Sequence, residues 1–162
     1  MALIAAVLAA GASTAKADLI VNGGFESGFT GWTVTNQAGG SGNWFIQSGT
    51  LSPTSGFTVP APPGPTHAAM TDQPGPGSHA LIQSFTVPVG SPTVILSFDW
   101  FVGNRAGAFA TPNSLDFTVS PNQQARVDIL TAGAGAFDLG ASVVDNVFQT
   151  HVGDPLVSGY NL

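Results

Sequence analysis

Short segments in which every second residue is apolar, separated by glycine and proline, run through this 162-residue chain. In residues 92–103 the even positions from Val94 to Val102 are all apolar, whereas the odd positions mix Ile95 and Phe101 with Ser97 and Asp99. Successive side chains of a strand point to opposite faces, so this alternation predicts a strand with one buried face. Because 21 Gly and 12 Pro interrupt such runs, long helices are not expected. The chain is predicted to be all-β, with residues 92–103 as its long core strand.

Seven further segments alternate or have the length of a strand. Together with residues 92–103 they predict roughly eight strands in an antiparallel two-sheet β-sandwich; the segments are residues 19–22, 31–35, 44–47, 81–87, 115–119, 125–129 and 143–148. Residues 58–77 contain VPAPPGP and QPGPG. Because Pro lacks an N–H donor, they are expected to form a long surface loop without a ladder, either functional or a stiff connector. Without a repeat or linker, residues 18–162 are expected to form one domain.

The start of the chain is typical of an export signal. The apolar run Leu3 to Ala12 is too short to span a bilayer and is followed by Ala15-Lys16-Ala17, a small-residue cleavage site before Asp18. Residues 1–17 are therefore predicted to be a signal peptide, and the protein is expected to be secreted or held at the cell surface. The chain begins Met-Ala-Leu, without the usual basic residue, and the alternative is a buried N-terminal helix.

The scarcity of charge excludes several classes of function. Only 7% of residues are charged, and three basic residues against nine acidic ones cannot neutralise a run of phosphates, so no nucleic-acid partner is expected. Without Cys there is no disulfide scaffold and no thiol chemistry. The acids form no recognisable catalytic pair, and His67, His79 and His151 lack metal-ligand spacing. We expect no catalytic residues and no enzyme activity.

Two motifs carry a resemblance to a known family. Asn22-Gly23-Gly24-Phe25-Glu26, followed by Gly31-Trp32, resembles the opening of galactose-binding-like jelly rolls, including carbohydrate-binding modules of the family 4 and family 9 type. The stretches TDQPGPGSHALIQSF and LSFDW are similar to the central strands of those modules. Residues 104–133 and 152–160 look like bacterial exported proteins that end in a PEP-CTERM sorting tail. The resemblance covers nearly all of residues 18–162 and implies a carbohydrate-binding jelly roll.

The resemblance also implies a C-terminal continuation. Related chains continue into closing strands with a V-D-N-V type sequence and then a tail with a membrane segment, whereas this sequence stops at Leu162. The domain of residues 18–162 is therefore expected to be truncated and to lack its closing strand, with membrane attachment only through an absent sorting tail. The internal residues 144–147 are similar to the V-D-N-V motif, and the alternative is that they form the closing strand.

Glu26 is the candidate metal ligand. In the resembled modules the Glu of the opening motif and an Asp of the closing strand hold a structural Ca²⁺, which prefers oxygen ligands. Glu26 is the only Glu in the chain, and the alternative is a solvent-facing carboxylate in a turn. Gly23 and Gly24 permit a tight turn with positive φ, and Phe25 and Trp32 are expected to be core anchors.

Sugar recognition requires flat aromatic faces and planar polar groups. The candidate carbohydrate-binding residues are Trp44, Asn104, Gln124 and Arg126. Trp44 is equally compatible with burial, and the alternative for Arg126 is a cross-strand ion pair with Asp99 or Asp128. We expect an exported, non-catalytic module that binds polysaccharide or glycan at the cell surface or in extracellular polysaccharide. The alternative is a structural matrix or adhesion protein without a specific glycan site.

Overall fold

The computed structural model describes residues 18–64, 66–91, 93–104, 107–119 and 123–161. The predicted signal segment, residues 1–17, lies outside this part of the chain. The regular structure within it is almost entirely β, which confirms the predicted class. It consists of β1 (Thr33–Asn36), β2 (Asn43–Gln47), β3 (Ala68–Asp72), β4 (His79–Ile82), β5 (Asp99–Gly103), β6 (Arg126–Leu130), the 3₁₀ turn η1 (Gly140–Ser142), β7 (Val143–Gln149) and β8 (Val157–Asn161).

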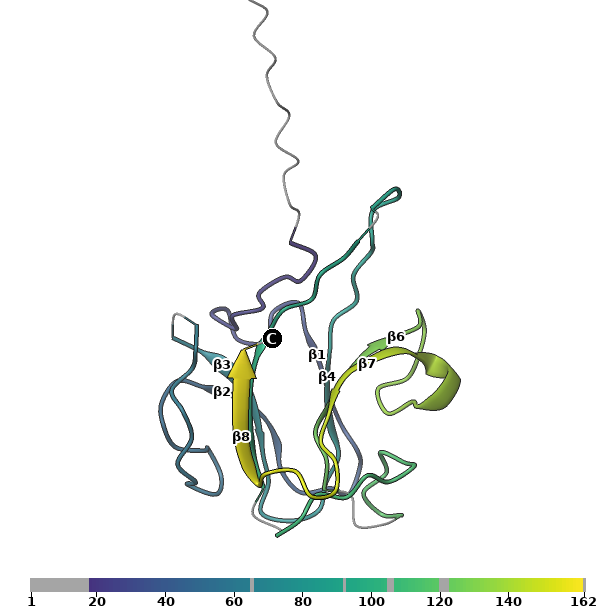
Figure 1. Ribbon diagram of the computed structural model, residues 1–162. Coiled ribbons are helices and arrows are strands. Elements are labelled where there is room, and N and C mark those ends of the chain that lie inside the picture. Colours follow the sequence, from purple (N-terminus) through teal and green to yellow (C-terminus); the bar gives the residue numbers. More distant parts are fainter. Residues whose placement is uncertain (1–17, 65, 92, 105–106, 120–122, 162) are drawn as a thin grey trace, which may run out of the picture.

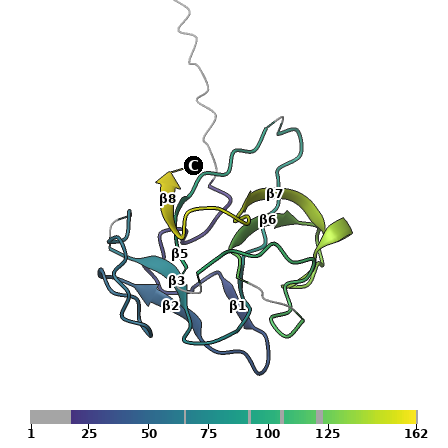
Figure 2. The same ribbon diagram turned by 60° about the horizontal axis from the view of Figure 1, so that its bottom comes forward.

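The strands form four antiparallel pairs. β1 pairs with β4, β2 with β3, β5 with β8, and β6 with β7, and β4 also contacts β2. β1 lies between the β2–β3 pair and the β6–β7 pair in both views (Figures 1 and 2). The β6–β7 ladder is irregular, with register shifts after Val127 and after Ile129. The structure thus consists of several short ladders, each of which fixes the register of its own two strands.

Burial is concentrated in small clusters. Among the described residues only Val59 and Phe109 are buried apolar side chains. The half-buried Trp100 of β5 packs on Phe148 of β7, with ring centroids 4.2 Å apart, and joins two of the strand pairs. Phe25 contacts Trp32 at 5.3 Å in the opening loop. Among the described residues the Trp100–Phe148 pair is therefore the ring contact that joins two strands, and the few buried apolar side chains do not form a wide layer.

The predicted core strand of residues 92–103 is wrong over most of its length. Of the described residues in this range only 99–103 form a strand, and residues 84–91 and 93–98 belong to an arm between β4 and β5 that projects from the rest of the molecule (Figure 1). β8 supplies a ladder only as far as Asp99, which pairs with Asn161. Alternation describes which side a residue faces and does not supply a partner strand. The arm consequently exposes several apolar side chains, namely Phe85, Val87, Val89, Val94, Ile95 and Leu96.

The Pro-rich segment contains a strand, contrary to the prediction of a loop without a ladder. β3 occupies residues 68–72, between prolines that precede Thr66 and follow Gln73, and pairs with β2 over five residues. Because the prolines flank this stretch, all its N–H groups are available to the ladder.

Two short segments predicted as strands are turns instead. Residues 19–22 lead into a turn in which Asn22 has φ of 54°. In residues 115–119 the Asp116 carboxylate accepts hydrogen bonds from Thr118 N (2.8 Å) and Thr118 Oγ1 (2.7 Å). A carboxylate that bonds its own backbone two residues on stabilises a turn over an extended strand.

Candidate functional site

The opening motif folds into a loop that its own asparagine holds together. Asn22 Nδ2 donates to the carbonyl oxygens of Gly28 (2.9 Å) and Thr30 (3.0 Å), and Asn22 Oδ1 accepts from Ser27 N (3.1 Å). Trp32 Nε1 donates to the Asn22 carbonyl (3.2 Å). Positive φ falls on Asn22 and Phe25 and not on Gly23 or Gly24, so the predicted glycine positions were wrong by one residue on each side. Asn tolerates this conformation better than most residues because its short side chain bonds locally.

Gln83 fastens both ends of this loop to the end of β4. Its Nε2 donates to the carbonyls of Val21 and Gly31, each at 2.9 Å, and its Oε1 accepts from Val21 N (2.6 Å). In the sequence Gln83 is a polar residue in phase with Leu81, Phe85 and Val87, so alternation places it on the same strand face as these apolar residues. The sequence contains no signal that this amide would reach a loop about sixty residues earlier in the chain.

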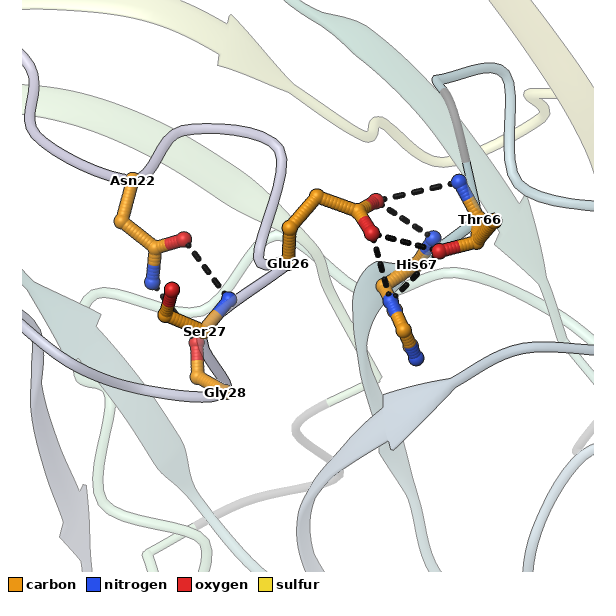
Figure 3. A network of polar contacts seen from close by, with 6 residues as sticks. All are labelled: Asn22, Glu26, Ser27, Gly28, Thr66 and His67. Carbon is orange, nitrogen blue, oxygen red and sulfur yellow. Dashed lines mark hydrogen bonds and ion pairs between the residues drawn. The ribbon is translucent and has the colours of Figure 1, made fainter.

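Glu26 extends from the loop to residues 66–67 (Figure 3). Its Oε1 accepts from the backbone N–H groups of Thr66 (3.0 Å) and His67 (2.9 Å). Its Oε2 accepts from Thr66 Oγ1 (2.5 Å) and from His67 Nδ1 (2.8 Å). The Thr66 hydroxyl first, and then the His67 side chain, lower the Glu26 pKa from 4.5 to about 2. Glu26 is thus a carboxylate held ionised by four donors, and neither Thr66 nor His67 was predicted as its partner.

These contacts bear on the predicted calcium site. Three of the four hydrogen-bond partners of Glu26 are nitrogen atoms, whereas Ca²⁺ prefers oxygen ligands, and only the Thr66 hydroxyl offers oxygen lone pairs. Within the described ranges, no group of three or more His, Asp or Glu side chains lies close enough together to hold a metal. The residues seen around Glu26 therefore do not fit a calcium site unless these hydrogen bonds are displaced, and calcium binding stays a prediction.

A second feature is an open hollow of about 430 Å³ beside the β6–β7 pair. Arg126 begins β6, and its register partner Gln149 ends β7. Ala110 N donates to Gln123 O (3.0 Å), which ties the segment before Thr111 to the residues before β6. The lining combines apolar groups with hydrogen-bonding ones: Thr111, Pro112, Asn113, Arg126, Leu139, Gly140, Val143 and Gln149.

Arg126 is held in place by its neighbour two residues along the strand. Its Nε and Nη2 donate to the two carboxylate oxygens of Asp128 at 2.8 and 2.9 Å, and both side chains are largely buried. Asn146 Nδ2 donates to Asp128 Oδ1 (2.6 Å) from β7. The predicted pairing with Asp128 is correct, but it runs along one strand rather than across two. The forked geometry fixes the guanidinium plane and neutralises its charge.

The four predicted carbohydrate-binding residues differ in their position relative to the hollow. Only Arg126 lines the hollow. Asn104 is buried after β5, where its Nδ2 donates to Ala108 O (2.8 Å). Trp44 is half-buried in β2 opposite Thr71, and Gln124 is half-buried two residues before β6.

Three lining residues lacked a sequence signal. Thr111, Asn113 and Gln149 are ordinary polar residues, and their only distinction is that tertiary contacts bring them beside Arg126.

Comparison with family models, curated proteins and solved structures found no match. Within the described residues, no helix has the length and apolar character needed to cross a membrane.

Proposed function

We propose that the chain is an exported, non-catalytic module of jelly-roll type that binds carbohydrate in the hollow beside β6 and β7. The observation that carries this proposal is the lining. Asn113, Arg126 and Gln149 offer planar polar groups for sugar hydroxyls, while Leu139 and Val143 offer apolar surface for the C–H face of a ring. The resemblance of the opening motif and of the central strands supports the same fold and ligand class.

Affinity electrophoresis or a glycan array with the intact chain tests this proposal. Replacing Asn113 and Gln149 together by Ala is expected to weaken binding about tenfold, because each lost hydrogen bond contributes about 0.5–1.5 kcal/mol. Thr33→Ala is the control, since Thr33 is an exposed polar residue of β1 outside the hollow. If no polysaccharide binds, or if the control and the double variant lose affinity equally, the proposal is wrong.

A second candidate function is that of a structural matrix or adhesion protein. The arm of residues 84–98 favours it, because the arm has no charged residue and exposes apolar side chains along both limbs. Replacing Val89 and Ile95 by Ser would then reduce adsorption of the protein to surfaces and leave glycan affinity unchanged. Loss of glycan affinity in the hollow variant, with adsorption intact, would favour the first function.

The resemblance also implies a structural calcium ion at Glu26, and this ion is a separate part of the proposal. Its binding would replace the Thr66 and His67 donors with the cation. The test is the melting temperature with excess Ca²⁺ and with excess chelator, since a ligand that binds only the folded state raises it. An unchanged melting temperature would refute the calcium site without bearing on the glycan site.

A further inference from the structure

His79, the first residue of β4, lies between two hydrogen-bond acceptors. Its Nδ1 is 2.7 Å from Asn36 Oδ1, and its Nε2 is 2.9 Å from the carbonyl oxygen of Ser41. A neutral imidazole has one N–H and one lone pair, whereas an imidazolium has two N–H groups. A neutral ring in this position would direct its lone pair at an oxygen.

The hydrogen-bond network around Asn36 determines which of its side-chain atoms faces His79. Trp44 N can only donate, and it lies 2.8 Å from Asn43 Oδ1, which identifies that atom as the oxygen. The Asn36 side chain also bonds Asn43 Oδ1 at 2.8 Å and must do so through its Nδ2 amide group. The Asn36 oxygen therefore faces His79. The Ser41 carbonyl is an acceptor in any case, so both ring nitrogens meet oxygens.

We propose that His79 is bound as an imidazolium and acts as a pH-dependent latch between the loop of residues 37–42 and the start of β4. The two N–H groups join Asn36 at the end of β1 and Ser41 in the loop, and Asn36 passes the connection to Asn43 at the start of β2. Loss of the proton breaks one of these bonds, because one ring nitrogen then opposes an acceptor. The latch is complete when the ring is protonated and opens when rising pH removes one of the two ring protons.

Backbone contacts keep the two segments together when the latch opens. Gln37 N donates to Ser78 O (2.9 Å), and Ser41 N donates to Pro76 O (2.8 Å). At Gly77 a Cβ atom would overlap the Ser41 carbonyl oxygen, so the two backbones approach as closely as glycine permits. Deprotonation is therefore expected to loosen the loop locally and not to unfold the domain.

Two carboxylates belong to the segments around this latch, and neither bonds the ring. Asp116 accepts from Gln37 Nε2 (2.6 Å), and hydrogen bonds from Thr118 and then Gln37 lower its pKa. Burial raises the pKa of Asp72, but the hydrogen bonds from Ser55 and Thr54 outweigh it, so the net pKa is lowered. Both acids remain ionised throughout the titration range of histidine.

Long-range ¹H–¹⁵N NMR spectra of the three His rings test the proposal directly. The folded chain is expected to hold a proton on both His79 nitrogens at a pH at which the same ring in the urea-unfolded chain has lost one of them. A folded ring that loses one of its two protons at the same pH as the unfolded ring, or at a lower pH, would overturn the proposal. This measurement needs no variant and so does not depend on the folding of a mutant.

Amide exchange measures the consequence of the latch for the loop. The protection factor of the Ser41 N–H, which already corrects for the effect of pH on the intrinsic exchange rate, is expected to fall about fivefold between about pH 5.5 and about pH 8.5. A fivefold change corresponds to the loss of one hydrogen bond. His79→Gln should abolish this pH dependence. His151→Gln is the control, because His151 is exposed in a different loop. This variant should show the same pH dependence as the wild type. Equal pH dependence in His79→Gln and the wild type would refute the latch.

Discussion

Replacing Asn22 tests whether the opening motif is held by a single side chain. Its amide group makes three hydrogen bonds: Nδ2 donates to Gly28 O and Thr30 O, and Oδ1 accepts from Ser27 N. Its backbone has φ of 54°, in the left-handed region. Asn22→Gly removes the three bonds and keeps the backbone conformation accessible. Asn22→Ala removes the same bonds and also places a Cβ in that conformation.

The contribution of each effect follows from this geometry. A net hydrogen bond contributes about 0.5–1.5 kcal/mol, and the lower half of this range applies here because two of the three bonds are solvent-exposed. At about 0.7 kcal/mol for each bond, Asn22→Gly should lose about 2 kcal/mol. The left-handed conformation costs Ala about 1–2 kcal/mol. Ala loses less chain entropy on folding than Gly, which offsets about 0.4–1 kcal/mol of that. Asn22→Ala should therefore be destabilised by about 3 kcal/mol, roughly 1 kcal/mol more than Asn22→Gly.

Urea unfolding monitored by tryptophan fluorescence measures both values, with equal m-values required for a valid comparison. Asn22→Asp is an informative third variant, because it tolerates positive φ and retains the acceptor for Ser27 N but loses both donors. It should be at least as destabilised as Asn22→Gly, because its second carboxylate oxygen would face the Gly28 and Thr30 carbonyl oxygens without a proton to share. An Asn22→Ala protein within about 0.5 kcal/mol of the wild type, the range of an ordinary surface substitution, would refute the reasoning. So would an Ala variant more stable than the Gly variant, since positive φ would then not matter.

Three further predictions concern acid, the aromatic contact and salt. The pKa of Glu26 is about 2 in the folded chain and 4.5 ordinarily, so its contribution to stability is present above pH 4.5 and lost as pH falls from 4.5 to 2. In Glu26→Gln the free energy of unfolding should therefore depend less on pH between 4.5 and 2, as measured by urea unfolding at several pH values. Phe148→Ala should lower the free energy of unfolding by about 2 kcal/mol, less than a fully buried Phe, while Phe148→Leu loses about half of that, as measured in urea. Because Arg126 is already paired with Asp128, affinity for a neutral polysaccharide should change less than about twofold with ionic strength in affinity electrophoresis. Asp128→Asn removes the negative partner of Arg126, so this variant should prefer acidic polysaccharides, and salt should weaken that preference.

The sequence predicted strands well where alternation and an available partner coincide. Residues 125–129 and 143–148 correspond closely to β6 and β7, which pair with each other across the segment containing η1. Residues 92–103 alternate as clearly, yet the ladder begins only at Asp99. The difference lies in the partner and not in the strand itself, because a partner from a distant part of the chain has no local signature in a single sequence.

The candidate site was predictable to the extent that its residues have unusual chemistry. Arg126 was identifiable because it is one of three basic residues in the chain, and its acid partner because it lies two positions along the same strand. The contacts of Glu26 with Thr66 and His67 join residues forty or more positions apart. Thr and His near a proline cluster are too ordinary to predict such a contact, and only the folded backbone brings them to the carboxylate.

The geometry of the opening motif separates fold from ligand binding. Asn22 uses its side-chain donors and acceptor within its own loop, Trp32 uses its indole N–H on the Asn22 carbonyl, and Glu26 uses both oxygens on residues 66–67. A side chain whose polar atoms are occupied in this way must break an internal bond to bind a ligand, which lowers its net contribution to affinity. The motif therefore holds the opening loop in place against residues 66–67 and against Gln83. Selective recognition is better sought at Asn113 and Gln149, whose polar groups line an open hollow.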